Sequence, residues 1–202
     1  MSSNCAPSAT RYRRRSHHAI MGATLELVSE VGYAKLTVEA IAARAGVGKQ
    51  TVYRWWPSKA AVLRDAVLHL CQDASGAVRD IPDTGDLAAD LKAVLRATAD
   101  TMSHPRYDLP ARALAAAGIA DAALGAQLVS GILEPQLRLY VRRLGAAQRS
   151  GQVEAGIDLR VALELLTGPL AFRWLMGDAP LTHAYTDTLV DLVLRGLAPR
   201  PS

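Results

Sequence analysis

A glycine turn between two short helical patterns, within residues 36–56, constrains the fold of this chain more than any other feature. Thr37 can cap a first helix with its hydroxyl, and the apolar residues after it recur at helical spacing up to Ala45. Gly46 can then adopt the left-handed conformation that ends a helix without steric cost. A second short helix opens at Gly48. This pattern predicts a helix-turn-helix, a motif that places its second helix in the DNA major groove.

The second helix divides its side chains between two directions. Lys49, Gln50 and Thr51 can reach phosphates and base edges, and the Gln50 amide can pair bidentately with adenine. Val52 and Trp56, four residues apart, can point the other way into a core. We therefore expect one helix face that reads DNA and one that is structural.

In residues 37–59 the chain resembles the tetracycline-repressor-like (TetR) family of bacterial one-component regulators. The matching motifs are T-V-x-x-I-A-x-x-A-G-V, then T-x-Y-x-aromatic-aromatic, then Ser-Lys at Ser58-Lys59. With the preceding helix, His17 to Val31, the specific match covers about fifty residues. Two departures stand out, because Gly48 replaces the usual Ser and Gln50 replaces a residue that is commonly small.

The resemblance implies a set of DNA-binding residues. Lys49, Gln50 and Thr51 would begin the recognition helix, Tyr53 and Trp55 would meet phosphates, and Trp56 would be structural. Two residues at helix N-termini, Thr37 and Lys59, would favour an anion. Arg44 either reaches the DNA backbone or lies on a solvated helix face.

Basic charge is concentrated at the start of the chain. Residues 1–64 hold ten Lys or Arg against three Glu, whereas residues 65–202 have a net charge of −3, within a formal total of +4. Such an asymmetry is typical of a module that binds a polyanion. Arg13, Arg14 and Arg15 precede the first helix, where they either contact DNA as a flexible arm or form a solvated tail.

The rest of the chain predicts an all-α protein of about nine helices, with no strand pattern and no internal repeat. We expect a basic flexible arm at 1–15, a three-helix DNA-binding domain at 16–64, and a larger ligand-binding and dimerisation domain at 65–202. Outside the helix-turn-helix, the expected helices lie at about 16–31, 58–74, 86–103, 109–117, 121–150, 158–176 and 182–197. Pro135 should kink one of them, and Gly118 should end another.

The last helix carries more apolar surface than a terminal helix needs, and in the family that the chain resembles the last two helices pair with their symmetry mates. A homodimer on a palindromic operator follows. A sensor also needs a pocket. Gly168-Pro169 should distort the helix expected at 158–176, and a distorted helix leaves a gap in which a ligand can sit. The residues that we expect to line such a pocket, if they do not simply fill the core, are Tyr107, Arg112, Gln136, Tyr140, Phe172, Arg173 and Trp174. Arg173, if buried, must meet an anion or an acidic side chain.

These patterns predict a cytoplasmic, sequence-specific transcriptional regulator, most simply a repressor that an unknown small-molecule effector releases from its operator. A ligand-independent regulator, an architectural DNA-binding protein and an α-helical enzyme are the alternatives. No catalytic motif, metal-ligand spacing, cofactor fingerprint or membrane-spanning stretch occurs, and Cys5 and Cys71 read as free thiols. We therefore expect no enzymatic activity, no cofactor, no metal and no membrane partner.

Overall fold

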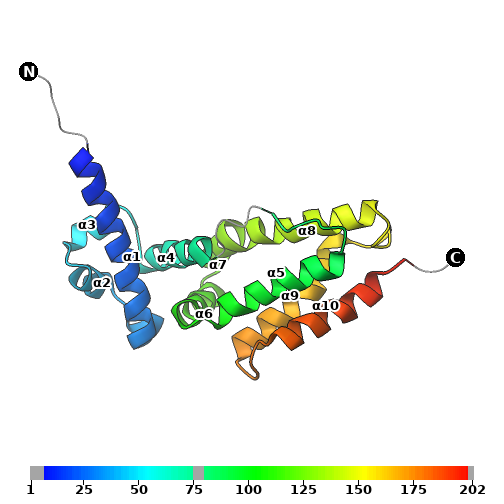
Figure 1. Cartoon of the computed structure of the whole chain (residues 1–202). Helices are drawn as coiled ribbons and strands as arrows, with labels where there is room; N and C mark the ends of the chain where they lie inside the picture. The colour runs from blue at the N-terminus through cyan, green and yellow to red at the C-terminus, as the bar shows by residue number, and fades with distance from the viewer. Residues whose placement is uncertain (1–6, 75–79, 200–202) are drawn as a thin grey trace, which may run out of the picture. The chain divides into compact units, whose positions relative to one another are not determined.

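Every regular element in the described part of the chain is a helix (Figure 1). The computed structural model describes residues 7–74 and 80–199, and the side chains of residues 15–70 and 80–199. The elements are α1 (Pro7–Lys35), α2 (Val38–Arg44), α3 (Lys49–Tyr53), α4 (Lys59–Ala74), α5 (Leu87–Ser103), α6 (Pro105–Ala120), α7 (Ala122–Leu128), the π-helical segment η1 (Val129–Leu133), α8 (Glu134–Arg149), α9 (Leu159–Met176) and α10 (His183–Leu197). The predicted all-α class is confirmed.

Contacts divide the chain into two compact units. Unit 1 comprises Met1–Asp73 and Leu109–Leu128, and unit 2 comprises Ala74–Asp108 and Val129–Ser202. Unit 1 therefore contains the helix-turn-helix together with most of α6 and all of α7.

The predicted helix-turn-helix forms in unit 1 for the local reasons that its residues suggest. The Thr37 hydroxyl accepts a hydrogen bond from the Ala40 backbone N–H at 3.1 Å and so caps α2. Gly46 has a φ of 66°, in the left-handed region that favours glycine, and it turns the chain after α2. At the start of α3, Gly48 is extended and supplies no side-chain cap.

The first helix begins earlier than expected. We predicted a flexible arm up to Arg15, but α1 begins at Pro7 and includes residues 7–15, so that expectation is corrected. Proline is favoured at the first position of a helix, and the arginines that follow are good helix formers. At the other end, Gly32 has a φ of 75° and interrupts the helix directly after Val31, the predicted end. Residues 1–6 of the predicted arm lie outside the described residues.

The core of unit 1 includes these apolar side chains between α1 and α4 that are at most 2% exposed: Ile20, Ile41, Val52, Trp56, Val62 and Leu63. Trp56 is the largest of them, and its indole Nε1 donates to Asp65 Oδ2 at 2.8 Å. Trp56 is therefore structural, as predicted, and its single polar atom is satisfied inside the unit.

A close backbone contact joins α6 and α7 and corrects a second expectation. Gly118 does not end a helix but lies inside α6. A Cβ atom on Gly125 would lie 2.6 Å from the Gly118 carbonyl oxygen, and one on Gly118 would lie 2.8 Å from a Leu128 methyl carbon. Gly125 therefore needs glycine because its backbone touches that of Gly118, whereas a side chain at Gly118 would first meet the movable end of Leu128.

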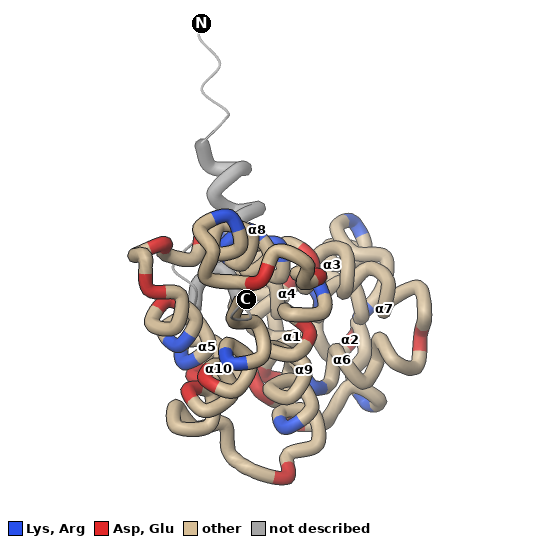
Figure 2. Tube along the Cα trace, turned by 90° about the vertical axis from the view of Figure 1, so that its right-hand side faces the viewer, with Lys and Arg blue, Asp and Glu red and all other residues tan. Residues whose placement is uncertain are grey.

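Unit 2 packs α5, α8, α9 and α10 around an apolar core that includes Leu91, Leu95, Leu144, Leu163, Leu166 and Val190. The helices α5, α9 and α10 begin where the sequence predicted, and the side chains of Asp86, Asp158 and Thr182 cap them. Ion pairs join α5 to α10, where Figure 2 shows basic and acidic residues side by side. No helix in the described part of the chain is long and apolar enough to cross a membrane.

A π-helical segment lies just before Pro135, where the sequence predicted a kink. α7, η1 and α8 follow one another without a break over the run expected as one helix, and η1 ends just before Pro135. Proline has no N–H to donate to the carbonyl of Gly131, and its ring crowds that carbonyl. The wider π-helical turn relieves both problems.

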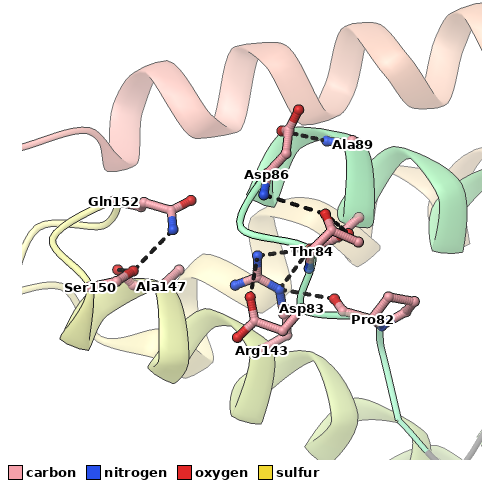
Figure 3. Close-up of polar contacts among 10 residues, drawn as sticks. Pro82, Asp83, Thr84, Asp86, Ala89, Arg143, Ala147, Ser150 and Gln152 are labelled. Atoms are coloured by element: carbon pink, nitrogen blue, oxygen red, sulfur yellow. Dashed lines mark hydrogen bonds and ion pairs between the residues drawn. The ribbon is translucent and has the colours of Figure 1, made fainter.

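A buried arginine anchors the segment before α5 (Figure 3). Arg143 is 3% exposed, and its guanidinium donates to Asp90 Oδ2 at 2.8 and 3.1 Å and to the Pro82 carbonyl at 3.1 Å. Asp90, also 3% exposed, accepts from Thr84 Oγ1 at 2.8 Å. Burial pushes the pKa of Asp90 up, but the hydrogen bonds from Arg143 and Thr84 outweigh it and hold that pKa below its usual value.

Candidate DNA-binding interface

The second helix of the motif, α3, exposes the side chains that the sequence assigned to DNA. Lys49, Gln50 and Tyr53 are exposed and Thr51 is partly buried, whereas Val52 is fully buried. The five-residue helix α3 thus presents a polar face to solvent and is anchored to the core by a single valine. This arrangement can enter a major groove without uncovering the core.

Lys49 already has a partner within the motif. Its ammonium group donates to Glu39 Oε1 in the first turn of α2. This hydrogen bond lowers the pKa of Glu39 and raises the pKa of Lys49, so both groups are charged at neutral pH. The pair is half exposed, so a phosphate can replace Glu39 as the partner of Lys49.

Arg44 is paired as well, which neither reading of its sequence position had foreseen. Its two terminal nitrogens donate to the two carboxylate oxygens of Glu30 at 2.9 and 2.7 Å, and one of them reaches Glu26 at 3.3 Å. The bidentate bond lowers the pKa of Glu30 and raises the pKa of Arg44. Arg44 therefore ties α2 to α1.

Lys59 serves the fold through its side chain. Its ammonium group donates to the carbonyls of Tyr33 and Leu36 at 2.9 and 2.8 Å, with Ala34 at 3.4 Å, and lies 4.5 Å from the centre of the Tyr33 ring. These carbonyls belong to the end of α1, where a cation is favourable. A phosphate could take this ammonium only by displacing those hydrogen bonds.

The tandem tryptophans differ in burial. Trp56 is 2% exposed, whereas Trp55 is partly buried. The His17 ring lies 4.5 Å from the Trp56 ring and 5.5 Å from the Trp55 ring, centre to centre. Burial, together with the nearby His18 and His69, lowers the pKa of His17 against the opposing effect of Asp65, so this ring is neutral at pH 7.

Arg54 is a further candidate that sequence reasoning missed. It is exposed at the C-terminal cap of α3, and its guanidinium carbon lies 5.2 Å from the centre of the Trp55 ring. No described acidic group forms an ion pair with it. The sequence signal that could have identified Arg54 is its position directly after Tyr53, a residue assigned to phosphate binding. Arg15 is exposed on α1, and the side chains of Arg13 and Arg14 lie outside those described.

The seven residues expected around an effector are divided between the two units. Arg112 belongs to unit 1 and the other six to unit 2. Tyr140 and Trp174 are buried, and both side chains are hydrogen-bonded. The Tyr140 hydroxyl pairs with Thr98 at 3.3 Å, and the Trp174 indole donates to Asp108 at 2.6 Å. The Tyr107 ring lies 6.3 Å from that of Trp174.

Two of the seven expectations are wrong about direction. Gln136 and Phe172 are exposed rather than inward. Phe172 lies two residues from the buried Leu170 and Trp174, a rotation of about 200° around the helix, so it faces away from the core. Gln136 lies in the first turn of α8, directly after Pro135.

Arg173 is not the buried arginine of unit 2. Its guanidinium carbon stacks 3.6 Å from the centre of the Tyr185 ring and the residue is only partly buried. The fully buried arginine is instead Arg143, whose acidic partner Asp90 lies 53 residues away in the sequence. Periodicity alone cannot reveal so distant a partner.

A half-open groove of about 450 Å³ lies within unit 1. Its lining comes from the end of the motif, from α4, and from α7 with the residue before it: Trp55, Trp56, Pro57, Ser58, Ala60, Ala61, Arg64, Asp65, Asp121, Ala123, Leu124 and Gln127. None of the seven expected effector residues is among them. No three His, Cys, Asp or Glu side chains in the described part of the chain are placed to hold a metal ion.

Two family models match this chain. One, described as bacterial regulatory proteins of the tetR family, matches residues 20–66. The other, described as the C-terminal domain of tetracyclin repressor-like proteins, matches residues 81–193. Together they cover the helix-turn-helix and most of the remaining helices.

Individual proteins agree with the family models. The DNA-binding transcriptional repressor TetR of Mycobacteroides abscessus is 28% identical over 181 residues, 87% of this chain and 90% of that protein. A crystal structure of a TetR-family transcription regulator is 33% identical, with a TM-score of 0.70 and coverage of 91% and 99% of the two chains. The regulator FadR from Bacillus subtilis, solved in complex with stearoyl-CoA, has a TM-score of 0.72 over 90% and 99%. At 21% identity this last likeness shows the fold alone.

Proposed function

The chain belongs to the tetR family of bacterial transcriptional regulators, and from this membership we propose that it is a repressor released from a palindromic operator by a small molecule. The observation that carries the DNA-binding half is α3, which exposes Lys49, Gln50 and Tyr53 above a fully buried Val52. The repressor half is supported by the name of the Mycobacteroides abscessus relative.

Sequence reading is assigned to Gln50 and phosphate binding to the cations around it. The exposed Gln50 amide offers a donor and an acceptor, which complement the acceptor and the donor that adenine presents in the major groove. Arg54 and Arg15 are exposed cations without an acidic partner among the described residues, and Lys49 can exchange Glu39 for a phosphate. Thr51, Tyr53 and Trp55 complete the interface, whereas Arg44 and Lys59 hold the motif together.

Homodimerisation is assigned to α9 and α10. Their outer faces carry large apolar side chains that are 39% to 63% exposed: Val161, Leu165, Phe172, Leu175, Met176 and Leu192. A surface of this kind favours a partner of the same chemistry. A second copy supplies it and also provides the second recognition helix that a palindromic operator requires.

Release by a small molecule is supported by the fold. A regulator of the same fold has been solved with stearoyl-CoA bound, so this helical architecture can hold a ligand. Such a ligand can act only through its preference for the conformation that does not bind the operator.

The test is selection of operators from a random DNA library by the full-length protein and by Gln50→Ala. We expect a palindromic motif for the native protein, and for the variant a relaxed preference at one position in each half-site, by about 1–3 kcal/mol. Thr51→Ser serves as a matched control that keeps the hydroxyl. Binding without any preferred sequence, together with a steep salt dependence, would identify an architectural DNA-binding protein instead.

A further inference from the structure

The groove of unit 1 is a concave surface that lies directly beside the DNA-binding motif. Its volume of about 450 Å³ falls within the range of roughly 300–1,000 Å³ that is usual for small-molecule sites. Trp55 and Trp56 at the end of the motif and Asp121 to Gln127 across from them line it, all within unit 1. The groove can therefore hold a compound of moderate size.

Two indole rings form an aromatic corner in this groove. The Trp55 and Trp56 rings are 5.6 Å apart between centres and stand at 87° to one another. Trp55 remains partly exposed although its neighbour is buried. A flat ring that enters the groove can stack on the partly exposed indole of Trp55.

Negative charge exceeds positive charge along the groove. Arg64 donates through Nε to Asp65 at 2.9 Å and through a terminal nitrogen to Gln127 Oε1 at 2.8 Å, so its charge is matched by Asp65. Asp121 is exposed, and its Oδ1 accepts from the backbone N–H groups of Ala123 and Leu124 at 3.0 and 3.1 Å. Among the described residues, no donor occupies its Oδ2.

The charge of Asp121 also acts on a neighbouring side chain. Burial and, after it, the negative charge of Asp121 raise the pKa of Tyr33. An uncompensated carboxylate beside two indoles attracts a cation, which indoles also bind through their π faces.

A hydrogen-bonded chain connects the groove to the motif. The Trp56 indole donates to Asp65, Asp65 accepts from Arg64, and Arg64 donates to Gln127 on α7. The centre of the Trp55 ring also lies 5.2 Å from the guanidinium carbon of Arg54, the phosphate-binding candidate at the end of α3. Displacement of either indole would therefore disturb the DNA-binding surface.

We propose that this groove binds a planar aromatic cation, such as an aryl amidine, and that its occupation weakens operator binding. The inference rests on the proposed function only for its second half, because occupation of the groove does not require DNA. It places an effector site within the DNA-binding unit and names the chemistry of its ligand.

The test uses three probes of one shape and different charge: 2-naphthamidine, 2-naphthamide and 2-naphthoate. The full-length protein is labelled with 5-fluorotryptophan, and its three tryptophan fluorine resonances are assigned by single Trp→Phe substitutions. We expect the amidine to shift the Trp55 and Trp56 resonances in a saturable way and to leave Trp174 unchanged. The amide should bind more weakly, and the carboxylate should not bind.

Asp121→Asn isolates the charge, because asparagine caps a helix as well as aspartate does. We expect this variant to melt as the native protein does and to bind the amidine at least fivefold more weakly. Asp178→Asn, an exposed aspartate outside the groove lining, is the matched control and should bind as the native protein does. Equal binding by Asp121→Asn, or equal binding of the carboxylate probe, would overturn the charge assignment.

The operator step is measured separately. Saturating amidine should lower the operator affinity of the native protein by about fivefold or more, and that of Asp121→Asn by less at the same concentration. Groove binding that leaves operator affinity unchanged would overturn the coupling, and a shift of Trp174 alone would overturn the site. If no DNA is selected at all, the proposed function fails while the fluorine spectra still decide whether the groove binds the cation.

Discussion

The two units use arginine–carboxylate pairs in opposite environments. In unit 1, Arg44 bridges to Glu30 with side chains that are 38% and 51% exposed. In unit 2, Arg143 bridges to Asp90 with side chains that are 1% and 3% exposed. Both pairs join one helix to another, but only the second is removed from water.

This difference separates a pair that contributes little to stability from a pair on which the core depends. An exposed pair is screened by water, so its loss costs the fold little free energy. A buried pair is costly to break, because removal of one partner leaves an uncompensated charge. The protein thus keeps a weakly stabilising pair between α1 and α2 and a strongly held pair between α5 and α8.

The largest expected effect concerns the exposed face of α9. Phe172→Asp should prevent dimerisation and lower operator affinity by about 10²- to 10⁴-fold, because the linked second half-site contact is lost. Analytical ultracentrifugation and DNA titration measure the two effects. Ile119→Asp, at an apolar residue of unit 1 that is 80% exposed, is the control and should remain dimeric. A dimeric Phe172→Asp protein would show that this face is not the interface.

The buried pair tests the comparison most directly. Arg143→Ala should destabilise the protein by about 3–5 kcal/mol, since it leaves Asp90 buried without its cation. Arg44→Ala removes the exposed counterpart and should change the urea midpoint far less. Urea unfolding of both variants decides the matter, and similar losses would mean that burial does not distinguish the two pairs.

Within unit 1, the adjacent tryptophans offer the same contrast for packing. Trp56→Ala should cost about 3–5 kcal/mol of stability, because its ring is 2% exposed and fills the core. Trp55→Ala should cost clearly less and weaken operator binding instead. Thermal melts beside DNA titrations provide the measurement. Equal destabilisation by the two substitutions would contradict the division between core and interface.

Acid should weaken unit 2 through Asp90. The folded-state pKa of this group lies below its ordinary value of 3.8, so its contribution to stability is present above that value and is lost as the pH falls through the lower folded pKa. Urea midpoints of the native protein should therefore decline below about pH 4. In Asp90→Asn this part of the decline should be absent, and an unchanged profile would exclude Asp90 as its source.

The smallest expected effect distinguishes cations that bind phosphate from cations that support the fold. Arg54→Ala should lower the slope of log affinity against log salt by about one unit and leave the selected operator unchanged. Arg44→Ala should leave that slope unchanged, because its guanidinium is held by Glu30. DNA titrations over a range of salt concentrations measure both. Equal slopes for native and Arg54→Ala proteins would remove Arg54 from the interface.

The sequence predicted those parts of the fold that depend on neighbouring residues. Thr37, Asp86, Asp158 and Thr182 each cap a helix three residues or fewer away, so the helix starts were visible in the pattern. Gly46 marked the turn for the same reason. Local hydrogen bonding and the left-handed conformation require no knowledge of tertiary packing.

The sequence could not predict which partner each charged or aromatic residue would choose. Lys59 was assigned to DNA from the motif, and Arg44 as one of two alternatives. Their side chains instead bind groups of α1 and the Leu36 carbonyl directly after it, 14 to 26 residues away. Gly118 looked like a helix end, because the approach of α7 is invisible in a linear pattern. Phe172 shares its sequence neighbourhood with Trp174 but not its side of the helix.

The contact between Gly118 and Gly125 limits how this protein can diversify. Because the backbone of one helix touches the other, no substitution at Gly125 can be absorbed by a rotamer change. The distance between α6 and α7 at this contact is therefore set by their backbones and not by side chains. Variation in the size of molecule that the groove accepts must come from residues that line it, such as Trp55, Leu124 and Gln127. Among descendants of this chain, Gly125 should change last and these lining residues first.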